Sequence, residues 1–121
     1  MESSQQRNNL RTCLQYQILG ISKIVFKLGG PRLAARLDDK LMEAAISQGW
    51  QVTIKNGRFK AFRDDLPWRV YREILQTAVK FAVNFCGKAR IENLIKLITA
   101  NLEKKTGVSY LETVYRLNIR Y

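Results

Sequence analysis

The sequence contains few residues that could do catalytic chemistry. It has no histidine, so the commonest general base and the commonest metal ligand are both missing. Its two cysteines, Cys13 and Cys86, are far apart and form no Cys-x-x-Cys motif, and Cys86 has no candidate base. We therefore expect a protein that is not an enzyme and that holds no metal and no cofactor. Both thiols are expected to be buried apolar side chains, which suits a reducing compartment.

The carboxylates also favour structural roles. Asp38, Asp39 and Glu43 could lie near one another on a helix, but Arg36 and Lys40 stand beside them. Intrahelical ion pairing is therefore their expected role. This pattern does not predict acid–base catalysis or a metal site built from oxygen ligands.

The charge balance is the strongest functional signal in the sequence. The chain of 121 residues has 21 Lys and Arg residues against 10 Asp and Glu residues, which gives a formal net charge of +11. Repulsion among so many like charges destabilises a compact fold unless a polyanion is nearby for part of the protein's life. Nucleic acid, anionic lipid and an acidic protein are all partners of this kind.

Basic residues recur at a spacing of four, which places each set on one face of a helix. The sets are Arg7 and Arg11, Lys23 and Lys27, and Arg32, Arg36 and Lys40. Like charges at this spacing weaken a helix by a few tenths of a kcal/mol per pair. The acids are too few to neutralise all the bases, so a bound anion is the partner that these faces favour.

A β-hairpin is predicted at Gln51–Arg63, where the hydrophobic period changes from about 3.6 to 2. Asn56-Gly57 at its centre is typical of a type I′ turn, which needs a positive φ at both central residues. The register that follows pairs Val52 with Ala61, Thr53 with Lys60, Ile54 with Phe59, and Lys55 with Arg58.

This register gives the hairpin two unlike faces. Ile54 and Phe59 should point into the core, and Lys55, Arg58 and Lys60 should point into solvent. Lys55 and Arg58 are direct cross-strand neighbours, and opposed like charges are destabilising. A phosphate bound between them would remove that cost, whereas a solvated face with splayed side chains is the alternative.

Apolar residues at spacings of three and four predict helices on both sides of the hairpin. The expected ranges are 10–28, 32–48, 66–86 and 89–105, and a capping box from Ser109 to Glu112 opens a short fifth helix. Gly29-Gly30-Pro31 should end the first helix. The expected fold is mainly α, with four to five helices and one β-hairpin inserted between helices two and three. Residues 1–9 are expected to form a frayed polar N-terminus, and residues 10–121 a single compact domain.

Two of these helices suggest further partners. The third has little polar face, so it is either central in the core or part of a subunit interface, such as that of a homodimer. The first is amphipathic and basic, as in proteins that bind peripherally to membranes. No apolar run is long enough for a transmembrane segment and no signal peptide is recognisable, so we expect a cytoplasmic protein.

The leading hypothesis is a small basic nucleic-acid-binding protein, regulatory or sequence-tolerant, that contacts phosphates from its hairpin and helix faces. The expected binding residues are Arg32, Arg36, Lys40, Lys55, Arg58, Lys60 and Arg63. One alternative is a non-catalytic adaptor or assembly factor that docks on an acidic protein partner. The other is peripheral membrane binding through helix one.

A basic helix followed by a basic hairpin, over Arg32–Arg63, resembles the recognition helix and wing of winged-helix proteins. A helix-turn-helix has a short helix and a tight turn before its second helix. Here a long helix and Gly29-Gly30-Pro31 stand in that place, and no functional residue is assigned from the resemblance.

Overall fold

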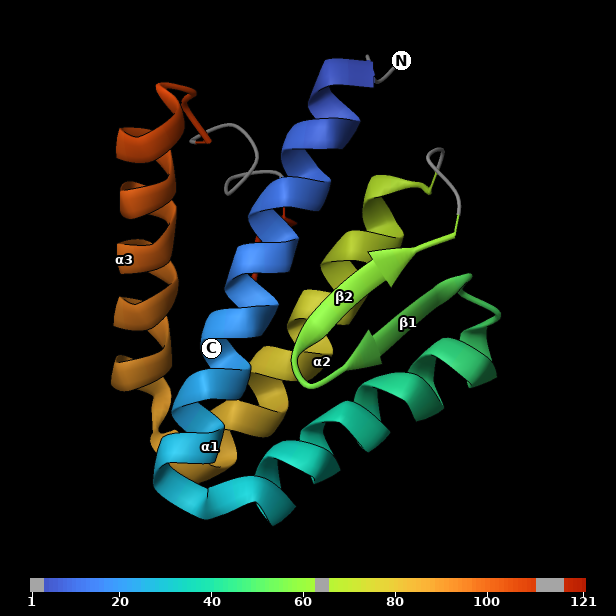
Figure 1. Ribbon diagram of the computed structural model, residues 1–121, viewed down its shortest axis with the longest axis vertical. Coiled ribbons are helices and arrows are strands. Elements are labelled where there is room, and N and C mark those ends of the chain that lie inside the picture. The colour runs from blue at the N-terminus through green and yellow to red at the C-terminus, as the bar shows by residue number, and fades with distance from the viewer. Residues whose placement is uncertain (1–3, 63–65, 111–116) are drawn as a thin grey trace.

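The described chain forms helix α1 (Ser4–Gln48), strands β1 (Val52–Lys55) and β2 (Arg58–Ala61), and helices α2 (Trp68–Cys86) and α3 (Lys88–Thr106). This computed structural model describes residues 4–62, 66–110 and 117–121. The two strands form one antiparallel hairpin. Figure 1 shows α3 on one side of the first half of α1 and the hairpin on the other. The prediction of a mainly helical fold with one hairpin is confirmed.

Helix α1 bends at Gly30. This residue has a φ of 79° and a ψ of −176°, outside the helical region, and Pro31 starts the next turn. The bend divides α1 into two segments, which we call the first arm (residues 4–29) and the second arm (residues 31–48). The predicted break at Gly29-Gly30-Pro31 is therefore confirmed, although the helix resumes directly after it.

The predicted number and order of helices were wrong. Because α1 bends without an intervening loop, both arms belong to one element, and the described residues form three helices instead of four to five. For the same reason the hairpin lies between α1 and α2, not between helices two and three. The predicted fifth helix falls on residues 111–116, outside the described residues. At the other end, α1 begins at Ser4, inside the segment that was expected to fray.

The hairpin has the predicted register. Val52 lies opposite Ala61, Thr53 opposite Lys60, Ile54 opposite Phe59, and Lys55 opposite Arg58. Asn56 and Gly57 have φ values of 54° and 74°, as a type I′ turn requires. Ile54 and Phe59 are buried, whereas the three basic side chains of the strands are exposed.

The hairpin turn packs closely against the first arm of α1. A Cβ atom at Gly57 would lie 2.4 Å from Cβ of Ser22, so the turn can approach this closely only with glycine. From the same arm, Nε2 of Gln15 donates a hydrogen bond to the carbonyl of Phe59 at 3.4 Å. On the second arm, the sulfur of Met42 accepts a hydrogen bond from a backbone N–H of β1 at 3.2 Å. The bent helix therefore holds the hairpin between its two arms (Figure 1).

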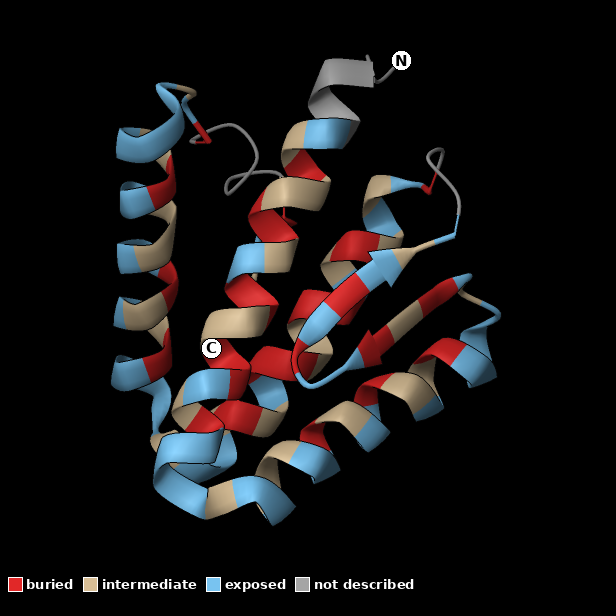
Figure 2. Ribbon diagram, in the orientation of Figure 1, coloured by how far each residue is buried: buried red, intermediate tan, exposed pale blue. Residues whose placement is uncertain are grey.

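Helix α2 supplies much of the core. Its buried residues are Tyr71, Ile74, Leu75, Ala78, Val79 and Ala82. They join one cluster of buried residues that also includes α1, both strands and α3 (Figure 2). The ring of Phe59 packs edge-on against Tyr71, with 6.1 Å between ring centroids. The apolar width that suggested a homodimer through this helix is therefore used mainly inside the chain, although Phe85 stays 48% exposed.

Replacing Gly57 with alanine should destabilise the fold more than replacing Gly49. The two glycines have φ values of 74° and 71°, so alanine introduces similar backbone strain at each, about 1–2 kcal/mol. A Cβ at Gly57 would also collide with Ser22, whereas nothing lies within 4 Å of a Cβ at Gly49. Urea unfolding should therefore show an additional loss of about 1 kcal/mol or more for Gly57→Ala. Equal losses for the two variants would contradict the close packing of the turn on α1.

Candidate functional site

The structure separates the predicted binding residues into two groups. We call Lys55, Arg58 and Lys60 the hairpin group, and Arg32, Arg36 and Lys40 on the second arm of α1 the arm group. The seventh predicted residue, Arg63, lies outside the described residues. All six described side chains are exposed. The hairpin group shares the solvent face of the two strands, as the register predicted.

Two residues of the arm group, Arg36 and Lys40, do not share a surface with the hairpin group. Asp38, on the second arm, faces the hairpin turn and is hydrogen-bonded to it. At about 100° of rotation per residue, Arg36 and Lys40 each lie about 160° around the helix axis from Asp38. They therefore lie on the side of the arm that faces away from the hairpin. The basic helix face and the basic hairpin that resemble a winged-helix protein thus point in different directions.

Asp38 does not form the intrahelical ion pair that its spacing predicted. Its Oδ2 accepts a hydrogen bond from the N–H of Asn56 at 2.7 Å, and its Oδ1 accepts one from the N–H of Gly57 at 3.1 Å. Within the part of the chain that the structure describes, no ion pair joins it to Arg36 or Lys40. The turn occupies both carboxylate oxygens, so this acid fastens the hairpin to the second arm.

Arg58 on the hairpin and Lys23 on the first arm of α1 line the same hollow, which has a volume of about 560 Å³. The other lining residues come from the two arms and the turn: Leu19, Ser22, Phe26, Pro31, Ala34, Ala35, Asp38 and Asn56. Asp38 is the acid of this lining, and the two turn N–H groups partly compensate its charge. Two exposed cations from different elements therefore face one open space, which is an arrangement suited to an anion.

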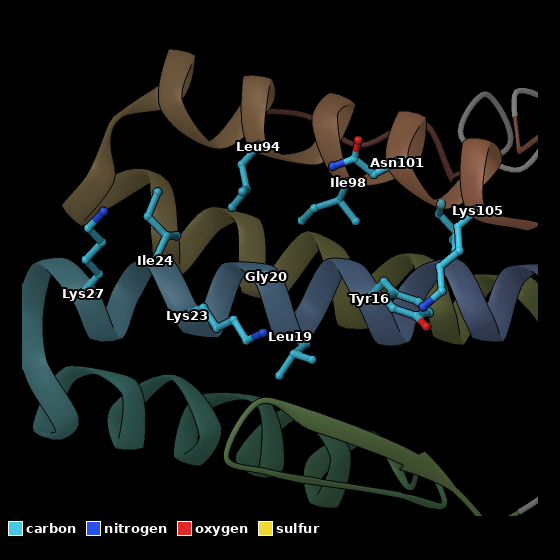
Figure 3. Close-up of a pocket in the computed structure, with 11 residues that line it drawn as sticks. Tyr16, Leu19, Gly20, Lys23, Ile24, Lys27, Leu94, Ile98, Asn101 and Lys105 are labelled. Carbon is cyan, nitrogen blue, oxygen red and sulfur yellow. The ribbon is translucent and has the colours of Figure 1, made fainter.

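A second hollow is a groove of about 490 Å³ between the first arm of α1 and α3 (Figure 3). Its walls are apolar and its border is basic: it is lined by Leu19, Gly20, Ile24, Leu94, Ile98 and Leu102, with Tyr16, Lys23, Lys27, Asn101 and Lys105. Nζ of Lys105 lies 5.9 Å from the centre of the Tyr16 ring, a cation–π contact. Lys23 borders both hollows, so basic residues continue from the hairpin across α1 to α3.

The sequence prediction did not include Lys23, Lys27 or Lys105 among the binding residues. Their spacing placed Lys23 and Lys27 on one helix face, but spacing does not show which neighbours that face meets. Arg58 and Lys105 approach it only through the tertiary fold. No local signal in the sequence joins these positions.

The two thiols are poorly placed for chemistry. Cys13 is fully buried, and burial raises the pKa of its thiol to about 12, so this thiol is protonated at neutral pH. Burial also raises the pKa of Cys86, although the charge of Arg90 opposes the shift. Over the described ranges, no three His, Cys, Asp or Glu side chains gather as a metal site would need. No helix in these ranges is both long and apolar enough to cross a membrane.

Comparison of the chain with protein-family models, with curated proteins and with solved structures finds no match. The described residues that best suggest a function are those of the basic surface that runs from the hairpin to the first arm of α1.

Replacing Asp38 with alanine should destabilise the protein by about 1–2 kcal/mol, because the turn loses two hydrogen bonds to a charged acceptor. Amide hydrogen exchange at Asn56 and Gly57 should also become faster. The matched control is Asp39→Ala, at the exposed neighbouring position, which should change stability by less than about 0.5 kcal/mol. If the Asp38 variant has the stability of the parent protein and the same amide exchange at Asn56 and Gly57, the carboxylate does not hold the turn.

Proposed function

We propose that the protein is a non-catalytic nucleic-acid-binding module that uses the solvent face of its hairpin and the adjoining hollow. The observation that carries this proposal is that Arg58 and Lys23 line the same hollow. A backbone phosphate placed there would be within reach of a guanidinium group and an ammonium group at once. Lys55 and Lys60 extend the positive surface along the hairpin.

The charge pattern explains why a polyanion is the favoured ligand. Lys55 and Arg58 are opposed across the two strands, and a bound phosphate would offset their mutual repulsion. Each phosphate that the protein neutralises releases condensed counterions, so affinity should fall steeply as salt is added. Contacts of this kind do not distinguish bases, which favours sequence-tolerant binding.

Exposed aromatic rings beside these cations favour single-stranded nucleic acid. Phe26 lines the hollow and is 54% exposed, and Tyr16 borders the groove and is 42% exposed. Bases stack on such rings with little sequence preference, and basic side chains beside them attract the phosphates.

Membrane binding through α1 has less support. The apolar stripe that suggested it consists of Leu10, Leu14, Ile18, Ile21, Val25 and Leu28, and all of these except Leu28 are buried. An amphipathic helix binds a bilayer by burying its apolar face in the lipid. In this fold that face is already packed in the core.

Reversing the charges of the hairpin group, with Lys55, Arg58 and Lys60 all replaced by glutamate, should strongly weaken binding to single-stranded oligonucleotides. The three side chains are exposed, so their replacement opens no cavity and the fold should persist. Titrations at about 50 and 200 mM salt should show a shallower salt dependence, with about one unit of slope lost for each phosphate contact removed.

The matched control reverses Arg32, Arg36 and Lys40, which changes the net charge by the same amount. Arg36 and Lys40 face away from the hairpin, so we expect a much smaller loss of affinity from this variant. If both triple variants lose affinity equally, the net charge is responsible and the hairpin is not the site. If the parent shows no salt-dependent binding to DNA or RNA, the proposed function is wrong.

A further inference from the structure

We propose that the groove between the first arm of α1 and α3 is a docking site for an acidic amphipathic helix of a partner protein. This site shares Lys23 with the hollow beside the hairpin, but its apolar walls come from α1 and α3, and the proposal does not depend on nucleic-acid binding. Figure 3 shows Leu94 and Ile98 pointing from α3 toward α1, with Lys27 and Lys105 at the two ends of the groove.

The shape of the groove suits a helix. Tyr16 and Lys27 mark its ends along α1, eleven residues apart, which corresponds to about 16 Å or three helical turns. The first arm and α3 run antiparallel along it (Figure 1). A third helix can lie between two neighbouring helices and bury one apolar stripe, with anchors spaced three or four residues apart.

Helix α3 packs closely on α1 at Gly20, which has no side chain. A Cβ at Gly20 would lie 2.2 Å from Cδ1 of Ile98, so this isoleucine packs directly on the backbone of α1. On α3, Leu94 and Leu102 continue the apolar lining one helical turn before and one turn after Ile98. Apolar anchors from a partner would therefore meet a continuous apolar surface.

The charges at the border of the groove favour an acidic partner. The groove is bordered by three exposed lysines, and none of the described residues that line it is an acid. The acids of α3 are engaged elsewhere: Glu92 pairs with Lys96 at 3.5 Å, and Glu103 accepts a hydrogen bond from the N–H of Tyr110 at 2.8 Å. A helix whose apolar stripe is flanked by Asp or Glu would match both features. A second copy of this chain would not, because each copy carries a net charge of +11.

The test uses a fluorescent synthetic peptide in which leucines follow one helix face and glutamates flank them. The control peptide has the same composition in an order that scatters the leucines around the helix. We expect the amphipathic peptide to bind the full chain at least about tenfold more tightly than the control. Amide shifts in two-dimensional NMR spectra should concentrate at the groove, around Gly20 and Ile98. Equal binding of both peptides, or no binding, would overturn the proposal.

Two variants with the same change in charge locate the site. Replacing Lys27 and Lys105 with glutamate should weaken binding of the amphipathic peptide by about tenfold or more. Replacing Lys80 and Lys104 with glutamate should have a much smaller effect on peptide binding, because these lysines are exposed but do not line the groove. Equal losses from the two pairs would mean that the peptide is attracted by net charge alone, and would overturn the proposal.

A third variant fills the groove without changing its charge. Asn101→Trp places a large ring at an exposed border position and should weaken peptide binding while leaving the unfolding transition unchanged. Single-stranded oligonucleotides and anionic vesicles are tested alongside. If either of them shifts the groove resonances and the peptide does not, the groove has a different occupant and the proposal is wrong. The hairpin charge reversals should not alter peptide binding, so this proposal and the proposed function can fail independently.

Discussion

The close contact between the Asn56-Gly57 turn and helix α1 determines how the hairpin is oriented and which of its side chains face solvent. Gly57 lies against Ser22 on the first arm, while Asp38 on the second arm accepts hydrogen bonds from both turn residues. A two-stranded hairpin is marginally stable by itself, so these contacts, together with the buried strand face, give it one orientation. That orientation directs the basic strand face into solvent and brings Arg58 to the same hollow as Lys23.

The fold assigns its acids and bases different roles. Several acids have structural partners: Asp38 holds the turn, Glu103 binds the backbone after α3, and Glu92 pairs with Lys96. The bases that border the two hollows are exposed; Asp38 only partly balances Lys23 and Arg58 in the first, and no described acid lines the second. The bases outnumber the acids by 21 to 10, and exposed bases gather around the two hollows, an arrangement that attracts a polyanion.

The sequence predicted the features that depend on local pattern. The hairpin, its register, its turn and its exposed bases all follow from the alternation around Asn56-Gly57, and the bend at Gly30 follows from two glycines and a proline. The helix count failed because residue preferences locate a break but do not show whether the helix resumes without a loop. The surface that we propose for binding differs in part from the one expected from the sequence, because the neighbours of Asp38, Lys23 and Arg58 are set by long-range packing. The sequence placed Arg36 and Lys40 in the same site as the hairpin, whereas the fold turns them away from it.

The most direct test of the account is a double-mutant cycle on Lys23 and Arg58, with affinity for a single-stranded oligonucleotide as the measured quantity. If both side chains act on one phosphate in the shared hollow, the Lys23→Ala and Arg58→Ala variants should each lose affinity. The double variant should then lose less than the sum, by about 1 kcal/mol of coupling. The control cycle pairs Lys23 with Lys40, on the far side of the second arm, and should be additive. Additive losses in the Lys23–Arg58 cycle would contradict a shared anion site.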